Sequence, residues 1–158
     1  MEQLPDVATL VAIYNQINAY GRTNGMELLL TRPGEVQYTM TVRPEHLSSP
    51  GTCHGGVLAG LMDSALGAAA LSLAFTAGEL VSTVEFKINY LHPVHLHDHL
   101  VAHGVVEHSG KTLVVSSATI TCPTRENLVV ARGLGTFNRY PATKRDFHDL
   151  LFPGEEVR

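Results

Sequence analysis

The strongest constraint on the fold is a long apolar segment in the middle of the chain. Residues 57–77 contain one ionisable side chain, Asp63, among small and apolar residues. The segment is long enough to span a membrane, but a carboxylate at membrane depth is costly and the small residues dilute the hydrophobicity. No Lys or Arg lies close to either end of it. We therefore expect a helix buried inside a folded domain rather than a transmembrane span.

Hydrophobic periodicity predicts the elements on either side of this segment. A helix is expected over about residues 6–20, ended by Gly21. Two strands are expected over residues 25–31 and 35–42, joined by a turn at Pro33-Gly34. The central helix should run from about Gly55 to Thr76. After it the period becomes two, which predicts four further strands near residues 83–90, 97–107, 111–121 and 127–138.

This order of elements predicts an α+β architecture. Successive strands with short turns imply an antiparallel sheet. A helix that is apolar on every side must be enclosed, so we expect the sheet to curl around it and a second subunit to cover what remains. The 158 residues are enough for a real core. We expect one domain over residues 1–158, with a polar tail over about residues 141–158.

Composition excludes several function classes. A net charge of −4 and a pI near 6.1 argue against a nucleic-acid partner, and no basic run indicates a membrane surface. The first 21 residues lack the basic and apolar regions of a signal peptide. The two cysteines, Cys53 and Cys122, show no disulfide-framework spacing, which predicts a reducing, cytoplasmic setting.

Asp63 is the first candidate functional residue. If the helix begins at Gly55, Asp63 lies about two turns along it. Burial without a partner is expensive for a carboxylate and raises its pKa. A carboxylate in an apolar wall is therefore a candidate general base or nucleophile. The alternatives are an ion pair with a Lys or Arg from another strand, or a side chain that faces solvent.

A His-Gly-Gly turn, His54 to Gly56, precedes the helix and is the second candidate feature. The start of a helix presents unpaired N–H groups and a positive dipole end. Glycine lets a ligand approach the backbone closely. Such a turn can stabilise a developing oxyanion. The alternative is a tight entry turn in which His54 caps the helix or packs against it.

Together these features resemble a known family, the hotdog-fold acyl-CoA thioesterases of the PaaI-type and THEM-type groups. The resemblance is carried by the turn at residues 54–56 and by the following positions: Leu61, Asp63, Gly67 and Ala69. Residues 84–93 resemble the strand after the family's helix, and residues 109–113 resemble its later hairpin. The match covers roughly residues 25–140, which is nearly the whole domain.

The resemblance implies a sheet wrapped around the central helix, pairing into a homodimer and often a dimer of dimers, and hydrolysis of an acyl-CoA thioester. No metal or organic cofactor is implied. Asp63 would activate water or attack the thioester carbon, the Gly55 N–H would stabilise the oxyanion, and His54 would help form the turn. In related hotdog thioesterases the oxyanion glycine and the carboxylate come from opposite subunits.

Two further positions are expected at the catalytic site. Six residues before the His the family often has Asn, whereas this chain has Ser48, which is shorter and lacks amide donors. The family often places Ser or Thr on the strand after the helix, and Thr83 fits that role. This departure from the family pattern bears on the expected substrate choice and rate more than on the expected fold.

The expected substrate-binding residues are Gly56, Gly110 and Lys111. Lys111 follows a hairpin glycine and is the preferred contact for the phosphates of CoA. Arg132 and Arg139 are further candidates, although most Lys and Arg side chains are simply solvated.

Two other features have less support as functional sites. In a strand, the three histidines of residues 95–99 would share one face, but ligands at this spacing rarely converge on one metal ion, so solvated side chains are expected. Cys53 adjoins the proposed site, but no His base and carboxylate are placed around it by the sequence. A packed, unreactive Cys53 is therefore expected.

The prediction from sequence is an acyl-CoA thioesterase. The rival is a non-catalytic acyl-CoA-binding hotdog protein that acts as a sensor or scaffold. Asp63 and the His-Gly-Gly turn favour the enzyme, while Ser48 slightly favours the rival. The His–Glu or His–Asp arrangement of a hotdog dehydratase is not found. An aryl or a medium-chain acyl group would fit equally well among the expected pocket residues Leu61, Phe75, Phe86 and Tyr90.

Overall fold

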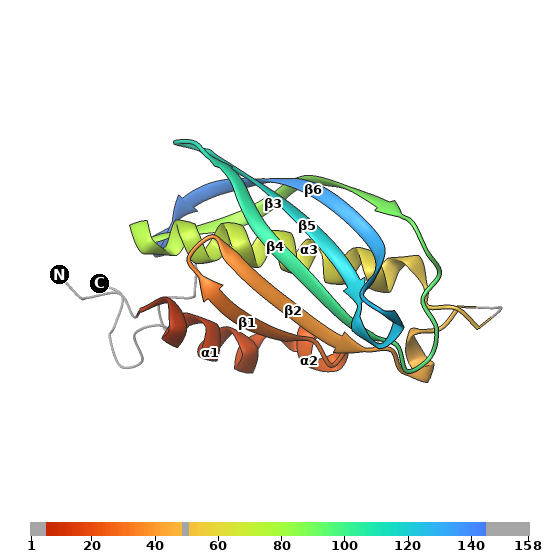
Figure 1. Ribbon diagram of the computed structural model, residues 1–158. Helices are drawn as coiled ribbons and strands as arrows, with labels where there is room; N and C mark the ends of the chain where they lie inside the picture. The colour runs from red at the N-terminus through yellow and green to blue at the C-terminus, as the bar shows by residue number, and fades with distance from the viewer. Residues whose placement is uncertain (1–5, 49–50, 145–158) are drawn as a thin grey trace.

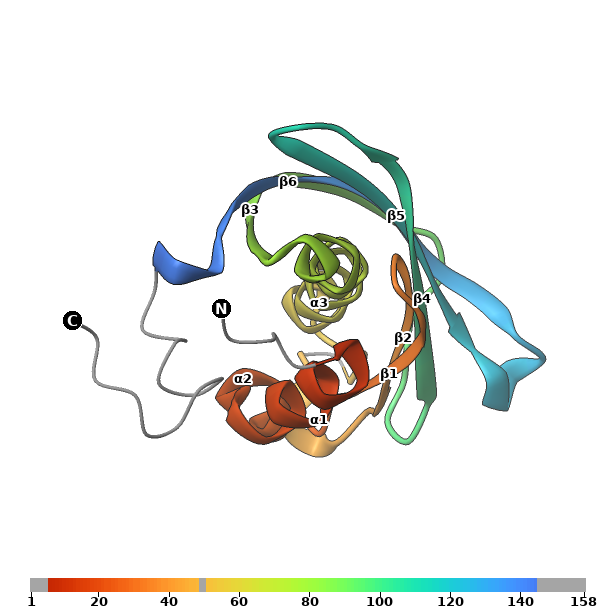
Figure 2. The ribbon, with the colours of Figure 1, turned by 90° about the vertical axis from the view of Figure 1, so that its left-hand side faces the viewer.

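Six antiparallel strands and one long helix, α3 (Gly55–Ala74), make up most of the structure, a computed structural model that describes residues 6–48 and 51–144 (Figure 1). The strands pair in the order β1-β2-β4-β5-β6-β3, so β1 and β3 form the edges of the sheet. Figure 2 looks along α3 and shows the sheet curled around it, which confirms the predicted architecture. The strand bounds are β1 Glu27–Arg32, β2 Glu35–Thr41, β3 Glu79–Tyr90, β4 His99–Ser109, β5 Leu113–Cys122 and β6 Leu128–Pro141.

The N-terminal helix is divided in two, which corrects the prediction of one helix over residues 6–20. Helix α1 (Val7–Ile17) ends before Asn18, and α2 (Ala19–Thr23) begins after it. The Asn18 side chain accepts a hydrogen bond from the Gly21 N–H at 3.0 Å and so caps α2. Short 3-10 turns complete the chain: η1 Pro44–His46, η2 Phe75–Ala77, η3 Pro123–Arg125 and η4 Ala142–Lys144.

Two other boundaries differ from those predicted. Strand β3 begins at Glu79, directly after Gly78, whose φ of 73° ends the helical segment. Strand β6 runs to Pro141, and Ala142 beyond it is buried, so the start of the predicted polar tail belongs to the fold. Residues 145–158 of that tail lie outside the described residues.

One side of α3 packs against the concave face of the sheet. Leu61, Met62 and Leu66 are fully buried there. Strand β4 approaches so closely at Gly104 that a Cβ atom would lie 2.4 Å from the carbonyl oxygen of Ala65. The segment Gly55–Ala77 is long and apolar enough to cross a membrane by length and composition alone. In this fold it is the core helix that the sheet encloses.

The other side of α3 carries mostly small and polar residues at helical spacing, with one leucine among them, and we call this face the α3 stripe. Positions three and four apart on a helix lie on one face. This stripe corrects the expectation of a helix that is apolar on every side, since it includes a carboxylate and a hydroxyl. Its members are Gly60, Asp63, Ser64, Gly67, Ala68 and Leu71.

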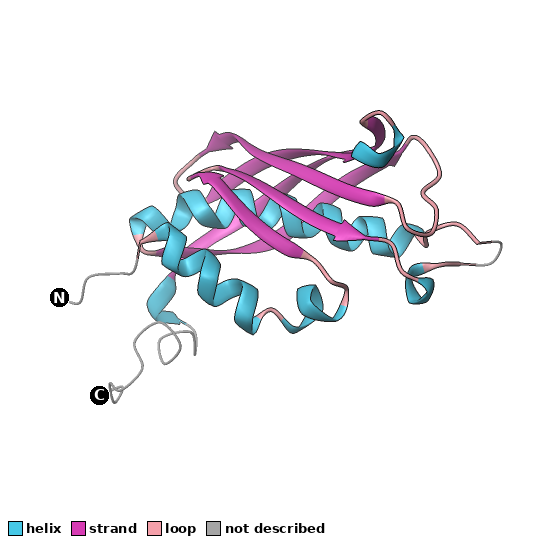
Figure 3. Ribbon diagram, turned by 60° about the horizontal axis from the view of Figure 1, so that its bottom comes forward, coloured by secondary structure: helices cyan, strands magenta, loops and turns pink. Residues whose placement is uncertain are grey.

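Helix α1 is attached to the edge of the sheet by one side chain. The Asn15 amide donates to the carbonyl oxygen of Leu28 on β1 at 2.9 Å, and its oxygen accepts from the Leu28 N–H at 3.0 Å. The amide therefore replaces part of the strand partner that edge strand β1 lacks. This pair of bonds fixes α1 beside α3, where both helices border the site described below (Figure 3).

Replacing Asn15 with Ala should lower the free energy of unfolding by about 2 kcal/mol, since two partly buried hydrogen bonds are lost at about 1 kcal/mol each. Urea denaturation measures the change. Gln16→Ala is the matched control, because Gln16 is the exposed neighbour on the same helix. Equal stability of the two variants would show that the Asn15 bridge does not hold α1 in place.

Candidate active site

A cavity of about 540 Å³ lies between the two N-terminal helices, the α3 stripe and the ends of β3 and β6. Figure 2 shows α1 and α2 on one side of α3 and strand β3 on the other. The wall away from α3 combines apolar and polar side chains, contributed by Leu10, Tyr14, Asn18, Tyr20, residues 80–83, Phe137 and Tyr140. A cavity of this size and mixed lining is typical of a small-molecule site.

Asp63 lies on the wall of this cavity and is half-buried rather than enclosed in the core. Its Oδ1 accepts a hydrogen bond from the Thr83 hydroxyl at 3.0 Å. Within residues 6–48 and 51–144 no Lys or Arg forms an ion pair with it. The lone carboxylate of the apolar segment therefore faces a cavity, and the sequence-based interpretation of a buried residue without a partner is corrected.

A bulge in β3 places Thr83 next to the carboxylate. Thr83 pairs with Phe137 on β6 and Glu85 pairs with Thr136, so the register shifts between these two β3 residues. Bulges re-aim side chains and are common beside active sites. Sequence reasoning expected Thr83 at the site but gave no indication of the bulge that directs it there.

The His-Gly-Gly turn forms the start of α3, as predicted. His54 is the N-cap, and its Nδ1 accepts a hydrogen bond from the Gly56 N–H at 2.8 Å. No described residue accepts a hydrogen bond from the Gly55 N–H. The turn therefore uses one backbone donor internally and leaves the other, at Gly55, for a ligand. The expected role of Gly56 in substrate binding is not supported by this bond, since its N–H is already engaged.

Gly55 borders a second, smaller cavity of about 260 Å³, which Tyr90 and the segment from Leu91 to Val94 also line. The Tyr90 hydroxyl donates to the Gly55 carbonyl oxygen at 2.9 Å. Asp63 and Gly55 are eight positions apart on one helix, which is about 12 Å at 1.5 Å per residue. One copy of the chain therefore does not bring this carboxylate and this N–H to the same atom of a ligand.

The other expected residues are placed away from Asp63. The Ser48 hydroxyl donates to the carbonyl oxygen of Thr52 at 3.1 Å, within its own turn. Gly110 and Lys111 lie at the β4–β5 hairpin and line neither cavity. Lys111 is exposed, and the carbonyl oxygen of Gly110 accepts from Arg139 at 2.9 Å.

The aromatic lining of the large cavity differs from the one expected. Leu61 and Phe75 are core residues, Phe86 packs against the core, and Tyr90 borders the smaller cavity. Sequence reasoning missed the aromatic lining residues Tyr14, Tyr20, Phe137 and Tyr140, and the amide of Asn18. The helical period of residues 6–20 indicates an apolar face, but nothing in it shows which cavity that face borders.

Polar side chains from the N-terminal helices extend the carboxylate's surroundings. Burial raises the pKa of Tyr14, and the nearby charge of Asp63 raises it further, while a hydrogen bond with Tyr38 acts in the opposite direction. The Asn18 amide donates to the Tyr38 hydroxyl at 3.2 Å. Tyr14 therefore remains neutral near physiological pH and presents a hydroxyl rather than a charge.

Cys53 does not have the properties of a nucleophile. It is buried, and burial, followed by the nearby charge of Asp98, raises its pKa to about 11.

The metal interpretation of residues 95–99 assumed that the three histidines share one face of a strand. His97 instead has a φ of 68° and lies in a turn. In the part of the chain that the structure describes, no group of three His, Cys, Asp or Glu residues is placed to hold a metal ion.

Comparison with known proteins agrees with this geometry. The family model described as the thioesterase superfamily matches residues 50–129, which include both the turn before α3 and Asp63. The acyl-coenzyme A thioesterase 13 of Homo sapiens is 35% identical over 94 residues, 60% of this chain. The chain spans 66% of that relative's length. The acyl-coenzyme A thioesterase PaaI of Escherichia coli is 29% identical over 116 residues, covering 73% of this chain and 80% of the relative.

Solved structures show the same arrangement. The E. coli PaaI protein of the phenylacetic acid degradation operon superposes with a TM-score of 0.77 at 27% identity, covering 85% of this chain and 94% of that one. A hypothetical thioesterase from Streptococcus pneumoniae, solved with coenzyme A, gives a TM-score of 0.66 at 31% identity, covering 73% and 86%.

Iodoacetamide near neutral pH should modify Cys53 at least about 100-fold more slowly in the folded protein than in the denatured chain, because a pKa near 11 leaves little thiolate and burial limits access. Peptide mass spectrometry after timed quenching measures the modification. The denatured chain at the same pH is the control. Rapid modification of the folded protein would contradict the assignment of Cys53 as a packed, unreactive thiol.

Proposed function

Because this chain belongs to the thioesterase superfamily, we propose that it is an acyl-CoA thioesterase, which hydrolyses a thioester to a free acid and CoA. Two relatives named acyl-coenzyme A thioesterases and a similar structure solved with coenzyme A support this substrate class. The observation that carries the proposal is the half-buried Asp63 carboxylate, hydrogen-bonded to Thr83 on the wall of a cavity large enough for an acyl group.

Asp63 acts on the thioester in one of two ways. As a general base, it removes a proton from water while the water oxygen attacks the thioester carbon. As a nucleophile, its own oxygen attacks, and water then hydrolyses the resulting anhydride. The Thr83 hydroxyl donates to Oδ1, whereas Oδ2 accepts no hydrogen bond from the described residues and is the freer atom for either role. In both routes the C–S bond breaks, and the departing CoA sulfur takes up a proton.

The acyl group lies in the large cavity along the α3 stripe. Gly67 and Ala68 leave room beside the helix because their side chains are small or absent. Tyr14 and Asn18 add polar groups to a wall that combines apolar and polar side chains. Such a lining accepts an apolar acyl group and orients it through a few polar contacts.

A second copy of the chain completes the site. The oxyanion that forms on the thioester requires a donor about 3 Å away, and within one copy the free Gly55 N–H lies about two helical turns from Asp63. We place Gly55 of one copy opposite Asp63 of the other in a homodimer, with His54 holding the turn. Pairing into a dimer of dimers, a cytoplasmic setting and the absence of nucleic-acid and membrane partners stay predictions from the sequence.

Asp63→Asn should lower kcat about 100-fold or more, the effect expected when a positioned base is lost. Asn retains an oxygen that accepts from Thr83, so the variant should fold normally. Release of free CoA thiol from aryl, short-chain and long-chain acyl-CoAs measures the activity. Glu27→Gln is the matched control, an exposed carboxylate on β1. Near wild-type turnover by a folded Asp63→Asn variant would remove Asp63 from the mechanism. Tight acyl-CoA binding without thiol release by the wild type would favour the non-catalytic binding protein.

Mixed dimers test whether Gly55 and Asp63 act across two copies. Gly55→Pro removes the N–H at a helix position that accepts proline, and the ψ of 136° at His54 already suits a following proline. Asp63→Ala removes the carboxylate. Each homodimer should be nearly inactive. With random pairing half the dimers are mixed, and each has one intact site, so co-refolded protein should recover about a quarter of wild-type activity.

Gly55→Ala is the control for this experiment, because it retains the N–H and its Cβ would meet Tyr90 at an ordinary 3.5 Å. It should keep more activity than Gly55→Pro. Mixed dimers that are verified by mass but show no recovery would place Gly55 and Asp63 in one subunit's site and contradict the shared arrangement.

A further inference from the structure

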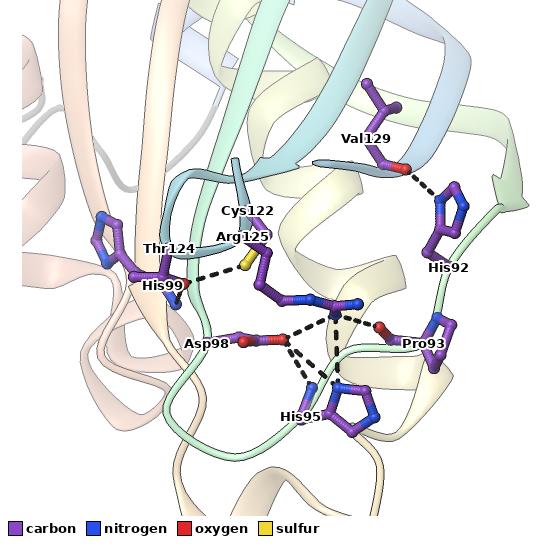
Figure 4. Close-up of polar contacts among 9 residues, drawn as sticks. All are labelled: His92, Pro93, His95, Asp98, His99, Cys122, Thr124, Arg125 and Val129. Carbon is purple, nitrogen blue, oxygen red and sulfur yellow. Dashed lines mark hydrogen bonds and ion pairs between the residues drawn. The ribbon is translucent and has the colours of Figure 1, made fainter. Parts of the chain in front are cut away.

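A polar cluster that the proposed reaction does not use surrounds the buried Asp98 at the turn before β4, while its partners His95 and Arg125 are partly exposed (Figure 4). Asp98 is 8% exposed, and its Oδ2 accepts hydrogen bonds from the His95 N–H at 2.9 Å and from Arg125 Nη1 at 3.3 Å. The same Arg125 nitrogen donates to the Pro93 carbonyl oxygen at 2.8 Å. One guanidinium group from the β5–β6 turn therefore holds both a carboxylate and a backbone carbonyl of the β3–β4 connection.

The backbone held by this cluster is paired with Thr52 and Cys53, which lead into α3 and which we call the entry segment of α3. We call residues Pro93 to His95 the strap. The Cys53 N–H donates to the carbonyl oxygen of Val94 at 2.8 Å, and Thr52 forms an antiparallel bridge with His95. The strap thus supports the chain only two residues before Gly55.

The strap and Gly55 also share a cavity. Pro93 and Val94 line the smaller cavity together with Gly55. The raised pKa of Cys53, to which Asp98 contributes, agrees with the closeness of this carboxylate to the entry segment of α3. A shift of the strap therefore changes both the wall of that cavity and the path of the backbone that carries the Gly55 N–H.

Asp98 itself is attached firmly to the sheet end. Its carbonyl oxygen accepts from the Val42 N–H at 2.9 Å, and its N–H donates to the His95 carbonyl oxygen at 3.1 Å. Removing Arg125 would leave a nearly buried carboxylate without its cation and the Pro93 carbonyl without its donor. The carboxylate and the carbonyl can gain new partners only if the strap moves or water enters beside it.

We propose that the Asp98–Arg125 ion pair positions the Gly55 N–H, by fixing the strap that pairs with the entry segment of α3. The inference rests on the proposed function, in which Gly55 stabilises the oxyanion. Neither Asp98 nor Arg125 touches the thioester, so both are positioning residues. Their contribution appears at the transition state, because an oxyanion donor acts mainly on charge that develops there.

Arg125→Met tests the proposal, since it keeps the length of the side chain and removes every donor. It should lower kcat for acyl-CoA hydrolysis about 10- to 100-fold with little change in KM, the range expected for a misplaced catalytic donor. Arg32→Met is the matched control, because Arg32 forms an exposed ion pair with Glu35 at the β1–β2 turn. Arg125→Lys keeps the positive charge but not the planar guanidinium with its several donors, so its kcat should lie between those of the wild type and Arg125→Met.

A double-mutant cycle separates positioning from a general structural effect. In the Gly55→Pro background the N–H is absent, so Arg125→Met should cause no further fall in kcat. A fall of the same size in both backgrounds would overturn the proposal. An unchanged kcat in Arg125→Met alone, with Gly55→Pro still strongly impaired, would also overturn it and would leave the proposed function intact.

Amide hydrogen exchange at Cys53, measured without substrate, tests the structural step independently of activity. Its N–H is bonded to Val94, so Arg125→Met should increase its exchange rate at least tenfold, whereas Arg32→Met should not. Faster exchange in Arg125→Met, together with a wild type that releases no thiol, would show that the strap is held as described but that the proposed function is wrong. If Arg125→Met does not fold, both measurements are made on Arg125→Lys. A wild-type kcat and a wild-type exchange rate of the Cys53 amide in Arg125→Lys would then overturn the proposal.

Discussion

Everything in this structure depends on the unequal packing of α3. Its sheet side is filled by Leu and Met side chains that are fully buried, and β4 can approach its backbone only because residue 104 is glycine. Its other side carries the α3 stripe, whose small residues leave a space where a core would otherwise continue. The carboxylate of Asp63 is tolerated in an apolar helix because it lies on that side, beside a cavity and a hydroxyl donor.

The same unequal packing of α3 explains where the N-terminal helices lie. They cover the cavity opposite the sheet, and the Asn15 bridge to β1 fixes them there. Tyr14 and Asn18 then supply polar groups to the cavity wall. At the other end of α3, His54 accepts from the Gly56 N–H, while no described residue accepts from the Gly55 N–H. Carboxylate and donor thus sit on one helix but about two turns apart, which is why we propose that a second copy completes the site.

Much of the fold could be predicted from local patterns. The change of period after Gly78 indicates strands, and the length of residues 57–77 demands enclosure. The break at Asn18 was missed because a side-chain cap competes with helical periodicity that otherwise continues. The bulge beside Thr83 was missed because it depends on the register with β6, a strand about fifty residues away in the sequence.

The candidate site was predicted less completely. Asp63, Gly55 and Thr83 are predicted from a lone carboxylate, a helix entry and a family resemblance, and the structure brings Asp63 and Thr83 together on one cavity wall. The cavity lining was not, because it is set by packing between segments far apart in the chain, as with Tyr14 and Phe137. The proposed roles of Asp98 and Arg125 follow only from contacts between the β3–β4 connection and the β5–β6 turn, and from the pairing of that connection with Thr52 and Cys53.

The most direct test is a crystal structure with a ketone analogue of an acyl-CoA, in which a CH₂ group between sulfur and carbonyl prevents hydrolysis. We predict that the acyl group fills the cavity along the α3 stripe. The ketone oxygen should lie about 3 Å from the Gly55 N–H of the partner subunit, with the ketone carbon facing Asp63. An acyl group outside this cavity, or a ketone oxygen bound by a donor other than Gly55, would contradict the account.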